Sequence, residues 1–213
     1  MARSTRTPRR PRWRRRKEAR PEEILSAALD VFVERGFAAA RLQEVARRAG
    51  VTKGTIYLYY PSKEALFKAV VRESLVVNLE RAEAALAAHQ GSAADAVRNL
   101  LRTVWRTVGA TKVSGIPKLI VAEASNFPEL AQFYWTEVAS RALALIGSII
   151  ERGVAQGEFR PVNARFTTLA AVAPLLFAVI WKHSLYPVSG LQFDFPAFLD
   201  DHLENFLRGL AHA

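Results

Sequence analysis

The chain has 213 residues, of which 50% are hydrophobic and 23% are charged, a composition typical of a globular protein with a buried core. It contains no cysteine, which excludes disulfide bonds, thiolate metal ligands and cysteine nucleophiles. The formal net charge of +10 is concentrated at the N-terminus, because residues 1–20 contain nine arginines and Lys17 against Glu18 alone. We therefore expect a disordered basic arm over residues 1–20 and a nearly neutral globular part after it.

From Pro21 onward, apolar residues recur at helical spacing, and no segment alternates as a strand would. The pattern predicts an all-α fold of about nine helices. They are expected over residues 21–36, 42–50, 52–60, 62–89, 93–110, a short segment after Pro117, 128–155, 164–184 and 195–210. The helix over 62–89 is long enough to contribute to two cores, so we expect one domain over residues 21–68 and a second over 69–213.

The most apolar run covers residues 166–181 and contains Pro174. It is shorter than the roughly 20 residues that a membrane-spanning helix needs, so we expect a buried helix and no membrane partner. No apolar stretch follows the arginines of the arm, as an export signal would require. These observations predict a cytoplasmic protein that associates with the nucleoid.

The most informative stretch is residues 41–67, RLQEVARRAGVTKGTIYLYYPSKEALF, where a glycine-containing turn joins two short helices, as in a helix-turn-helix. Ala46 and Gly50 are expected to let the helices cross closely, while Val51 and Ile56 anchor the second helix to the core. The opposite face of that helix then presents an ammonium group, hydroxyl groups and bare backbone, which suit phosphates and base edges in a DNA groove. This face comprises Lys53, Gly54, Thr55, Tyr57, Leu58 and Tyr59.

These residues resemble the TetR family of transcriptional regulators. The resemblance covers residues 24–68 and includes Gly36-Phe37, the run from Lys53 to Tyr57 and the run from Pro61 to Leu66. It implies an all-helical homodimer whose N-terminal three-helix module binds an operator and whose larger C-terminal domain binds a small effector and dimerises. Within the family, the segments IPKLIVAEASNFPELAQFYWTEV and IIERGVAQGEFRPV resemble the AefR-like group of C-terminal domains.

The family pattern, carried over by position, implies base or groove contacts for Lys53, Gly54 and Thr55, and phosphate contacts for Tyr57, Tyr59 and Lys63. Thr52 corresponds to the residue that caps the recognition helix and can reach a phosphate. The chain departs from the pattern at Arg41, which replaces a capping hydroxyl residue and could itself contact a phosphate, and at Leu58, which replaces a frequent aromatic residue. The predicted DNA-binding set is Arg41, Thr52, Lys53, Gly54, Thr55, Tyr57, Leu58, Tyr59 and Lys63.

Two further sets are predicted in the C-terminal part. Aromatic and apolar side chains, with one carboxylate to fix a polar group, are expected to line an effector pocket, and core packing is the alternative. This ligand-binding set is Trp105, Val108, Glu123, Phe133, Tyr134, Phe177 and Trp181. The last two helices contain more apolar residues than a single core-facing stripe requires. The additional apolar side chains indicate a dimer interface, and burial within one protomer is the alternative. The interface set is Val172, Leu176, Val179, Phe198, Leu199, His202 and Phe206.

The sequence therefore predicts a ligand-responsive transcriptional regulator, most simply a repressor that binds a palindromic operator as a homodimer and is released by a small apolar or aromatic effector. Its expected partners are duplex DNA, the effector and a second copy of the chain. The alternative is a non-specific nucleic-acid binder that acts through the arginine-rich arm. An enzyme is not expected, because no nucleophile–base pair or phosphate-binding loop is found. The four histidines lack the spacing of metal ligands, so we expect no metal and no cofactor.

Overall fold

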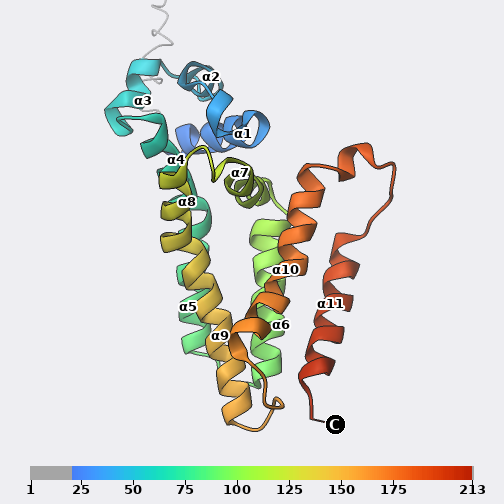
Figure 1. The fold of residues 1–213 in the computed structure, drawn as a ribbon. Coiled ribbons are helices and arrows are strands. Elements are labelled where there is room, and N and C mark those ends of the chain that lie inside the picture. The colour runs from blue at the N-terminus through green and yellow to red at the C-terminus, as the bar shows by residue number, and fades with distance from the viewer. Residues whose placement is uncertain (1–20, 213) are drawn as a thin grey trace, which may run out of the picture.

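The structure, a computed structural model, describes residues 21–212, so the predicted arm over residues 1–20 lies outside it. The described residues are helical throughout and contain no strand, which confirms the all-α fold class (Figure 1). When helices that continue into one another are counted once, this part of the chain contains nine helices, as expected.

The first three helices gather at one end of the molecule, together with the start of the fourth (Figure 1). They are α1 (Pro21–Ala39), α2 (Leu42–Arg48), α3 (Lys53–Tyr59) and α4 (Lys63–Val71). Local signals set their boundaries. The hydroxyl of Thr52 accepts a hydrogen bond from the Thr55 amide, and that of Ser62 accepts one from the Ala65 amide, so each satisfies an amide that the first helical turn leaves free.

The helix predicted over residues 62–89 is present as one continuous helix. It consists of α4, a π-helical turn (Arg72–Val76) and α5 (Val77–Ala87). Leu66, Phe67 and Val70 are buried in the core of the N-terminal helices, whereas Leu86 packs against the core of the C-terminal helices. The same helix therefore contributes to both cores, as expected from its length.

The remaining helices form the larger, lower part of the molecule (Figure 1). The ribbon runs through α6 (Ala93–Val104), α7 (Gly115–Glu123), α8 (Pro128–Tyr134), α9 (Ser140–Ala155), α10 (Ala164–His183) and α11 (Phe195–Leu210). A π-helical turn (Trp105–Gly109) extends α6, and another (Trp135–Ala139) joins α8 to α9 without a break.

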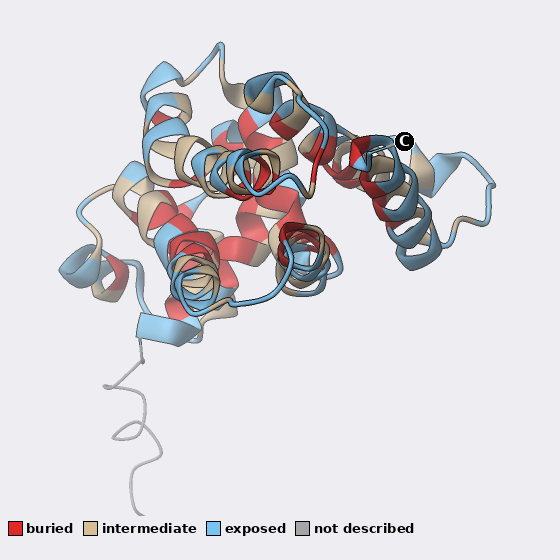
Figure 2. Ribbon diagram, turned by 90° about the horizontal axis from the view of Figure 1, so that it is seen from below, coloured by how far each residue is buried: buried red, intermediate tan, exposed pale blue. Residues whose placement is uncertain are grey.

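Buried residues form two clusters along the inner faces of these helices (Figure 2). The first cluster joins α1–α4 to α7 and α8 through Ile116, Leu119 and Leu130. The second joins α6, α9, α10 and α11. The predicted domain division at residues 68 and 69 stays a prediction, but the N-terminal helices share their core with α7 and α8.

Helix α10 differs from the buried helix that was expected. It is 20 residues long, and within the described chain it is the one helix long and apolar enough to span a membrane by length and composition. Only 28% of its apolar window is buried. Ala171, Leu175 and Ala178 face the core, whereas Phe166 and Leu169 on the other side are exposed. Helix α10 therefore has two apolar faces. One packs against the core of the protomer, and the other is exposed.

Candidate nucleic-acid interface

The turn between α2 and α3 places α3 on the surface of the N-terminal module. Gly50 has φ of +68°, a conformation that favours glycine, and a side chain there would meet no atom within 4 Å. The expectation that Gly50 permits a close helix crossing is therefore wrong, because its requirement is conformational. Ala46 and Ile56 do lie in the core, and the Val51 amide donates to the Ala46 carbonyl at 2.9 Å.

The buried side of α3 fixes which side chains reach solvent. Ile56 is fully buried, and at 100° per residue Gly54 and Leu58 lie almost opposite it. Leu58 is 84% exposed, and Tyr57 and Tyr59 are about half exposed. The predicted outer face of α3 is thus accessible. The hydroxyl of Thr55 lies 2.9 Å from that of Thr52, so it is held at the start of the helix.

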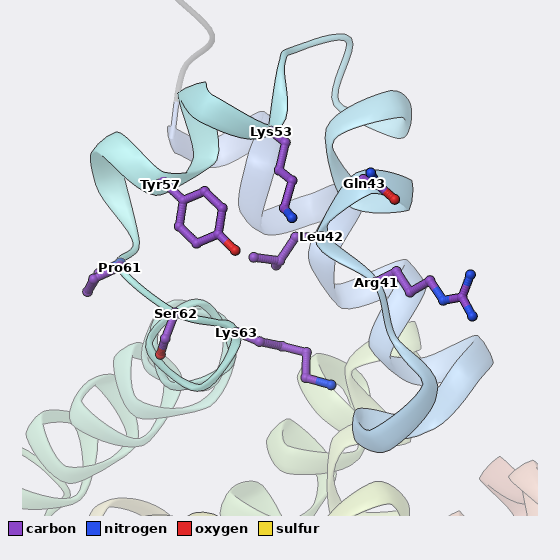
Figure 3. A pocket seen from close by; sticks show the side chains of 8 residues that line it. All are labelled: Arg41, Leu42, Gln43, Lys53, Tyr57, Pro61, Ser62 and Lys63. Atoms are coloured by element: carbon purple, nitrogen blue, oxygen red, sulfur yellow. The ribbon is translucent and has the colours of Figure 1, made fainter.

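One side of α3 borders a surface hollow of about 400 Å³, between α2, α3 and the start of α4 (Figure 3). The side chains of Lys53 and Tyr57 both point into this hollow, and the ammonium of Lys53 lies 5.5 Å from the Tyr57 ring centre. Arg41 is exposed, caps no amide and points away from the hollow. The structure therefore brings Lys53, Tyr57 and Lys63 around one concave surface, and Arg41 lies at its edge with the guanidinium directed outward.

Sequence reasoning missed Gln43, an exposed residue of α2 that also lines the hollow. Its side-chain amide can donate and accept at the same time, which suits the paired donor and acceptor groups of adenine in the major groove. Its position in the sequence could have indicated this, because Gln43 lies in the first turn of α2, two residues after Arg41, on the polar side of that helix.

Lys63 has a different environment from the one predicted. Its ammonium donates hydrogen bonds to the carbonyl oxygens of Phe37, Ala38 and Ala40 at 2.8, 3.0 and 3.3 Å. It also lies 4.6 Å from the centre of the Phe37 ring. An ammonium has three N–H donors, so a phosphate contact through this group would have to replace one of these bonds. Lys63 therefore satisfies carbonyl groups at the C-terminal end of α1.

Two acidic residues hold α2 against α1 through one arginine. The Arg48 guanidinium donates to Glu34 of α1 at 2.7 and 2.6 Å and to Glu44 of α2 at 2.6 Å. These hydrogen bonds lower the pKa of both carboxyl groups below the usual value. The orientation of the helix that precedes α3 is therefore set by a paired, ionised network.

The residues predicted to bind an effector do not converge on one site. Trp105 is buried against Phe195, and Trp181 packs among Tyr186, Phe193 and Phe195. Val108, Phe133 and Tyr134 pack against the first core cluster instead, and burial raises the pKa of Tyr134 to about 12. Phe177 is 64% exposed on α10.

Glu123 also lies elsewhere. Its carboxylate accepts a hydrogen bond from the Ala38 amide of α1, so the structure gives no support to a role in ligand binding.

The predicted interface residues divide into two groups. Val179 and Leu199 are buried in the protomer core, where a partner cannot reach them, so their assignment to the dimer interface is wrong. Leu176 is exposed, and Val172, Phe198, His202 and Phe206 are half-buried. The exposed apolar face of α10 also contains residues that the prediction omitted. They are Phe166, Leu169, Ala170, Ala173 and Phe177.

Polar contacts link the end of α10 to α1. The His183 imidazole lies 2.7 Å from the Ser114 hydroxyl, which itself donates to the Thr111 carbonyl. Two residues earlier, Lys112 forms an ion pair with Asp30 of α1 at 2.7 Å. The turn before α7 therefore contacts α10 on one side and α1 on the other.

Acidification is expected to destabilise this link. Burial, followed by the charges of Lys182 and Lys118, lowers the pKa of His183 below its usual value. His183 therefore binds a proton less readily in the folded protein than in the unfolded chain. The contribution of neutral His183 to the free energy of unfolding is complete above about pH 6.5 and is lost as the pH falls through the lowered pKa. We expect the melting temperature to fall between about pH 7.5 and pH 5.5. His183→Gln, which can still donate to Ser114, should reduce that fall, and an identical pH dependence would contradict the assignment.

Comparisons with known proteins agree with this geometry. The family model described as "Bacterial regulatory proteins, tetR family" matches residues 24–70, and the "Tetracyclin repressor-like, C-terminal domain" model matches residues 87–189. The regulator RutR of Escherichia coli K12 is 51% identical over 57 residues, which span 27% of this chain and only 27% of RutR. The fatty acid metabolism regulator protein of Bacillus subtilis is 26% identical over 146 residues, or 68% of this chain and 74% of that protein.

Solved structures share the whole fold. FadR of Bacillus subtilis in complex with stearoyl-CoA has a TM-score of 0.76 at 22% identity, covering 90% of this chain and all of that one. The ketosteroid regulator KstR2 of Mycobacterium tuberculosis has a TM-score of 0.71 at 16% identity, covering 91% and 95%. The fold and the exposed α3 face define a helix-turn-helix regulator, and the chain belongs to the TetR family of bacterial transcriptional regulators. The narrower AefR-like resemblance stays a prediction.

Proposed function

We propose that the protein is a repressor that binds a palindromic operator as a homodimer and is released by a small apolar or aromatic effector. The observation that carries this proposal is the concave surface formed by Arg41, Gln43, Lys53, Tyr57 and Lys63 beside the exposed face of α3. It combines groups that can attract phosphates with groups that can read base edges, and its two residues from α3, Lys53 and Tyr57, lie on a helix that Ile56 anchors to the core.

The exposed apolar face of α10 supports the homodimer. Phe166, Leu169, Ala173, Leu176 and Phe177 recur at spacings of three and four residues and contain no charge. Pairing this face with the same face of a second copy would bury it about a two-fold axis. Two recognition helices about 34–36 Å apart could then read the two halves of a palindrome.

The names of the relatives support an apolar effector. They refer to fatty acid metabolism, stearoyl-CoA and ketosteroids. We propose that such a molecule favours an arrangement of the C-terminal helices in which the recognition helices no longer match the operator. A hundredfold loss of operator affinity requires the effector to bind the released form better by about 2.7 kcal/mol. Operator binding places the protein in the cytoplasm, associated with the nucleoid.

Selection from a randomised duplex library tests the function directly. The full chain should enrich one palindromic sequence and bind it as a dimer. The same selection with a chain lacking residues 1–20 should enrich the same sequence, with weaker affinity and a smaller dependence on salt, because fewer phosphates are neutralised. Loss of all selectivity in the shortened chain would favour the alternative of non-specific binding through the arm.

Substitutions on the concave surface, and at Thr55 of the adjoining helix α3, should separate sequence-specific binding from general affinity for DNA. We expect Gln43→Ala, Lys53→Ala and Thr55→Ala to change the enriched sequence, since a good base contact discriminates by about 1–3 kcal/mol. Tyr57→Phe should weaken binding to all duplexes to a similar extent, because a phosphate contact carries no sequence information. The measurements are repeated selection and fluorescence anisotropy, and unchanged binding in all four variants would refute the interface.

A further inference from the structure

The end of α1 is kinked at Gly36, and residues 37–40, which follow the kink, form the link to α2. Gly36 interrupts α1 with φ of 75° and ψ of 170°, so the residues after it cannot continue the hydrogen bonds of the helix. Residues 37–40 then lead directly into α2, which carries Arg41 and Gln43 at its start. The position of this segment therefore sets where the α2–α3 pair begins.

The turn between α7 and α8 contacts this segment from the C-terminal part of the molecule. Glu123 Oε1 accepts a hydrogen bond from the Ala38 amide at 3.2 Å, and Glu123 Oε2 accepts one from Asn126 Nδ2 at 3.4 Å. The ring of Phe127 packs edge-on against that of Phe37, with centres 4.8 Å apart. One hydrogen bond and one ring contact thus join α7–α8 to residues 37 and 38.

The opposite side of the same segment is held by α4. The Lys63 ammonium donates hydrogen bonds to the carbonyl groups of Phe37, Ala38 and Ala40. The Glu123 carboxylate accepts one from the Ala38 amide. Three carbonyl groups and one amide of the segment are therefore bonded to side chains of two helices that lie outside the helix-turn-helix. Gly36 adds to the fit, because a side chain there would begin 3.2 Å from Glu123 Oε1 and at an unfavourable φ.

We infer that Glu123 is a positioning residue for operator recognition, through which the C-terminal helices hold the start of α2 in register. The inference rests on the proposed function and extends it to a residue outside the DNA-binding face. Reading base edges requires a fixed orientation of α2 and α3, whereas general attraction to phosphates tolerates their displacement. Loss of the Glu123 hydrogen bond should therefore reduce selectivity more than it reduces binding to unrelated DNA.

Three substitutions separate the reach of the side chain from its charge. Glu123→Ala removes the acceptor, Glu123→Asp keeps the charge but withdraws the acceptor by one methylene, and Glu123→Gln keeps the acceptor without the charge. Glu129→Gln on the neighbouring helix is the charge-matched control, because Glu129 is exposed and is separate from the α1–α2 segment. Each variant is measured against the duplex selected by the unaltered protein and against a scrambled duplex of equal length.

We expect Glu123→Ala and Glu123→Asp to weaken binding to the selected duplex about tenfold, since a dimer loses two hydrogen bonds worth about threefold each. Their binding to the scrambled duplex should change by less than about twofold. Glu123→Gln should behave as Glu129→Gln does. Hydrogen exchange of the peptide over residues 36–41 should be faster in the alanine and aspartate variants alone, at a temperature where circular dichroism shows every variant folded.

The outcomes distinguish this inference from the function on which it rests. Equal affinity of all variants for the selected duplex would overturn the role of Glu123 and leave operator binding intact. Weakening in Glu123→Gln with none in Glu123→Asp would also overturn it, because charge rather than the hydrogen bond would then matter. Parallel losses on both duplexes would indicate general destabilisation and overturn it as well. If the unaltered protein selects no sequence, the proposed function fails, and this inference fails with it.

Discussion

Leu169→Asp is expected to convert the proposed dimer into a monomer and to weaken operator binding strongly. Leu169 is 49% exposed at the centre of the apolar face of α10, between Phe166 and Ala173. The apolar side chains of this face offer a carboxylate no hydrogen-bond donor, and the nearest charge along α10 is Arg165, which is exposed one turn before Leu169. Two-fold symmetry places the substitution in the interface twice, and each unpaired buried charge costs several kcal/mol.

The loss of the dimer should weaken operator binding by at least about 100-fold, because each half-site would then be bound separately. Size-exclusion chromatography with light scattering gives the mass, and anisotropy gives the affinity for the selected duplex. Val104→Asp on α6 is the control, since Val104 is also an exposed apolar residue but lies off this face. A dimeric Leu169→Asp protein with unchanged affinity would rule out the α10 interface.

Lys63→Ala is expected to lower the stability of the protein as well as its affinity for DNA. The Lys63 ammonium is bonded to three carbonyl oxygens, and its removal leaves these acceptors at the end of α1 without that donor. Hydrogen bonds to a charged group contribute about 1.5–3 kcal/mol, and in a protein of this size each kcal/mol shifts the melting temperature by about 2–4 °C. We therefore expect a decrease of roughly 4–8 °C.

Lys53→Ala is the matched comparison for Lys63→Ala, because both substitutions remove one ammonium from the lining of the same hollow. Lys53 lies over the Tyr57 ring and makes no hydrogen bond among the described residues, so its loss should alter DNA binding with little change in melting temperature. Differential scanning fluorimetry without DNA separates the two cases. If Lys63→Ala melts with the unaltered protein, Lys63 has no structural role and the phosphate contact implied by the family remains the better explanation.

Several local features of the fold were predictable because their signals lie within a few residues. Thr52 and Ser62 cap α3 and α4 with their own hydroxyl groups, and Gly36 interrupts α1 where glycine can adopt a positive φ. The outer face of α3 followed from helical periodicity once Ile56 was assigned to the core. The order of the helices and most of the DNA-binding face therefore needed no tertiary information.

Two predicted site residues, Glu123 and Lys63, have hydrogen-bond partners far away in the chain. Glu123 was assigned to an effector pocket, but its partner Ala38 is 85 residues earlier. The carbonyl groups that Lys63 binds lie 23–26 residues before it, in another helix. Residue type and spacing indicate what a side chain can bind, whereas the packing of whole helices decides which group lies within hydrogen-bond distance of it.

By itself, the sequence determined that this protein is all helical, that α3 presents a polar and aromatic face around Lys53 and Tyr57, and that α10 is apolar on more than one side. Periodicity and capping are local properties, so they can be read without knowing the packing. Only the tertiary structure decided that Val179 and Leu199 are buried while Phe166 and Leu169 are exposed. A helix that is apolar on several sides can be buried on any of them, and the side that is covered depends on the angles at which distant helices meet.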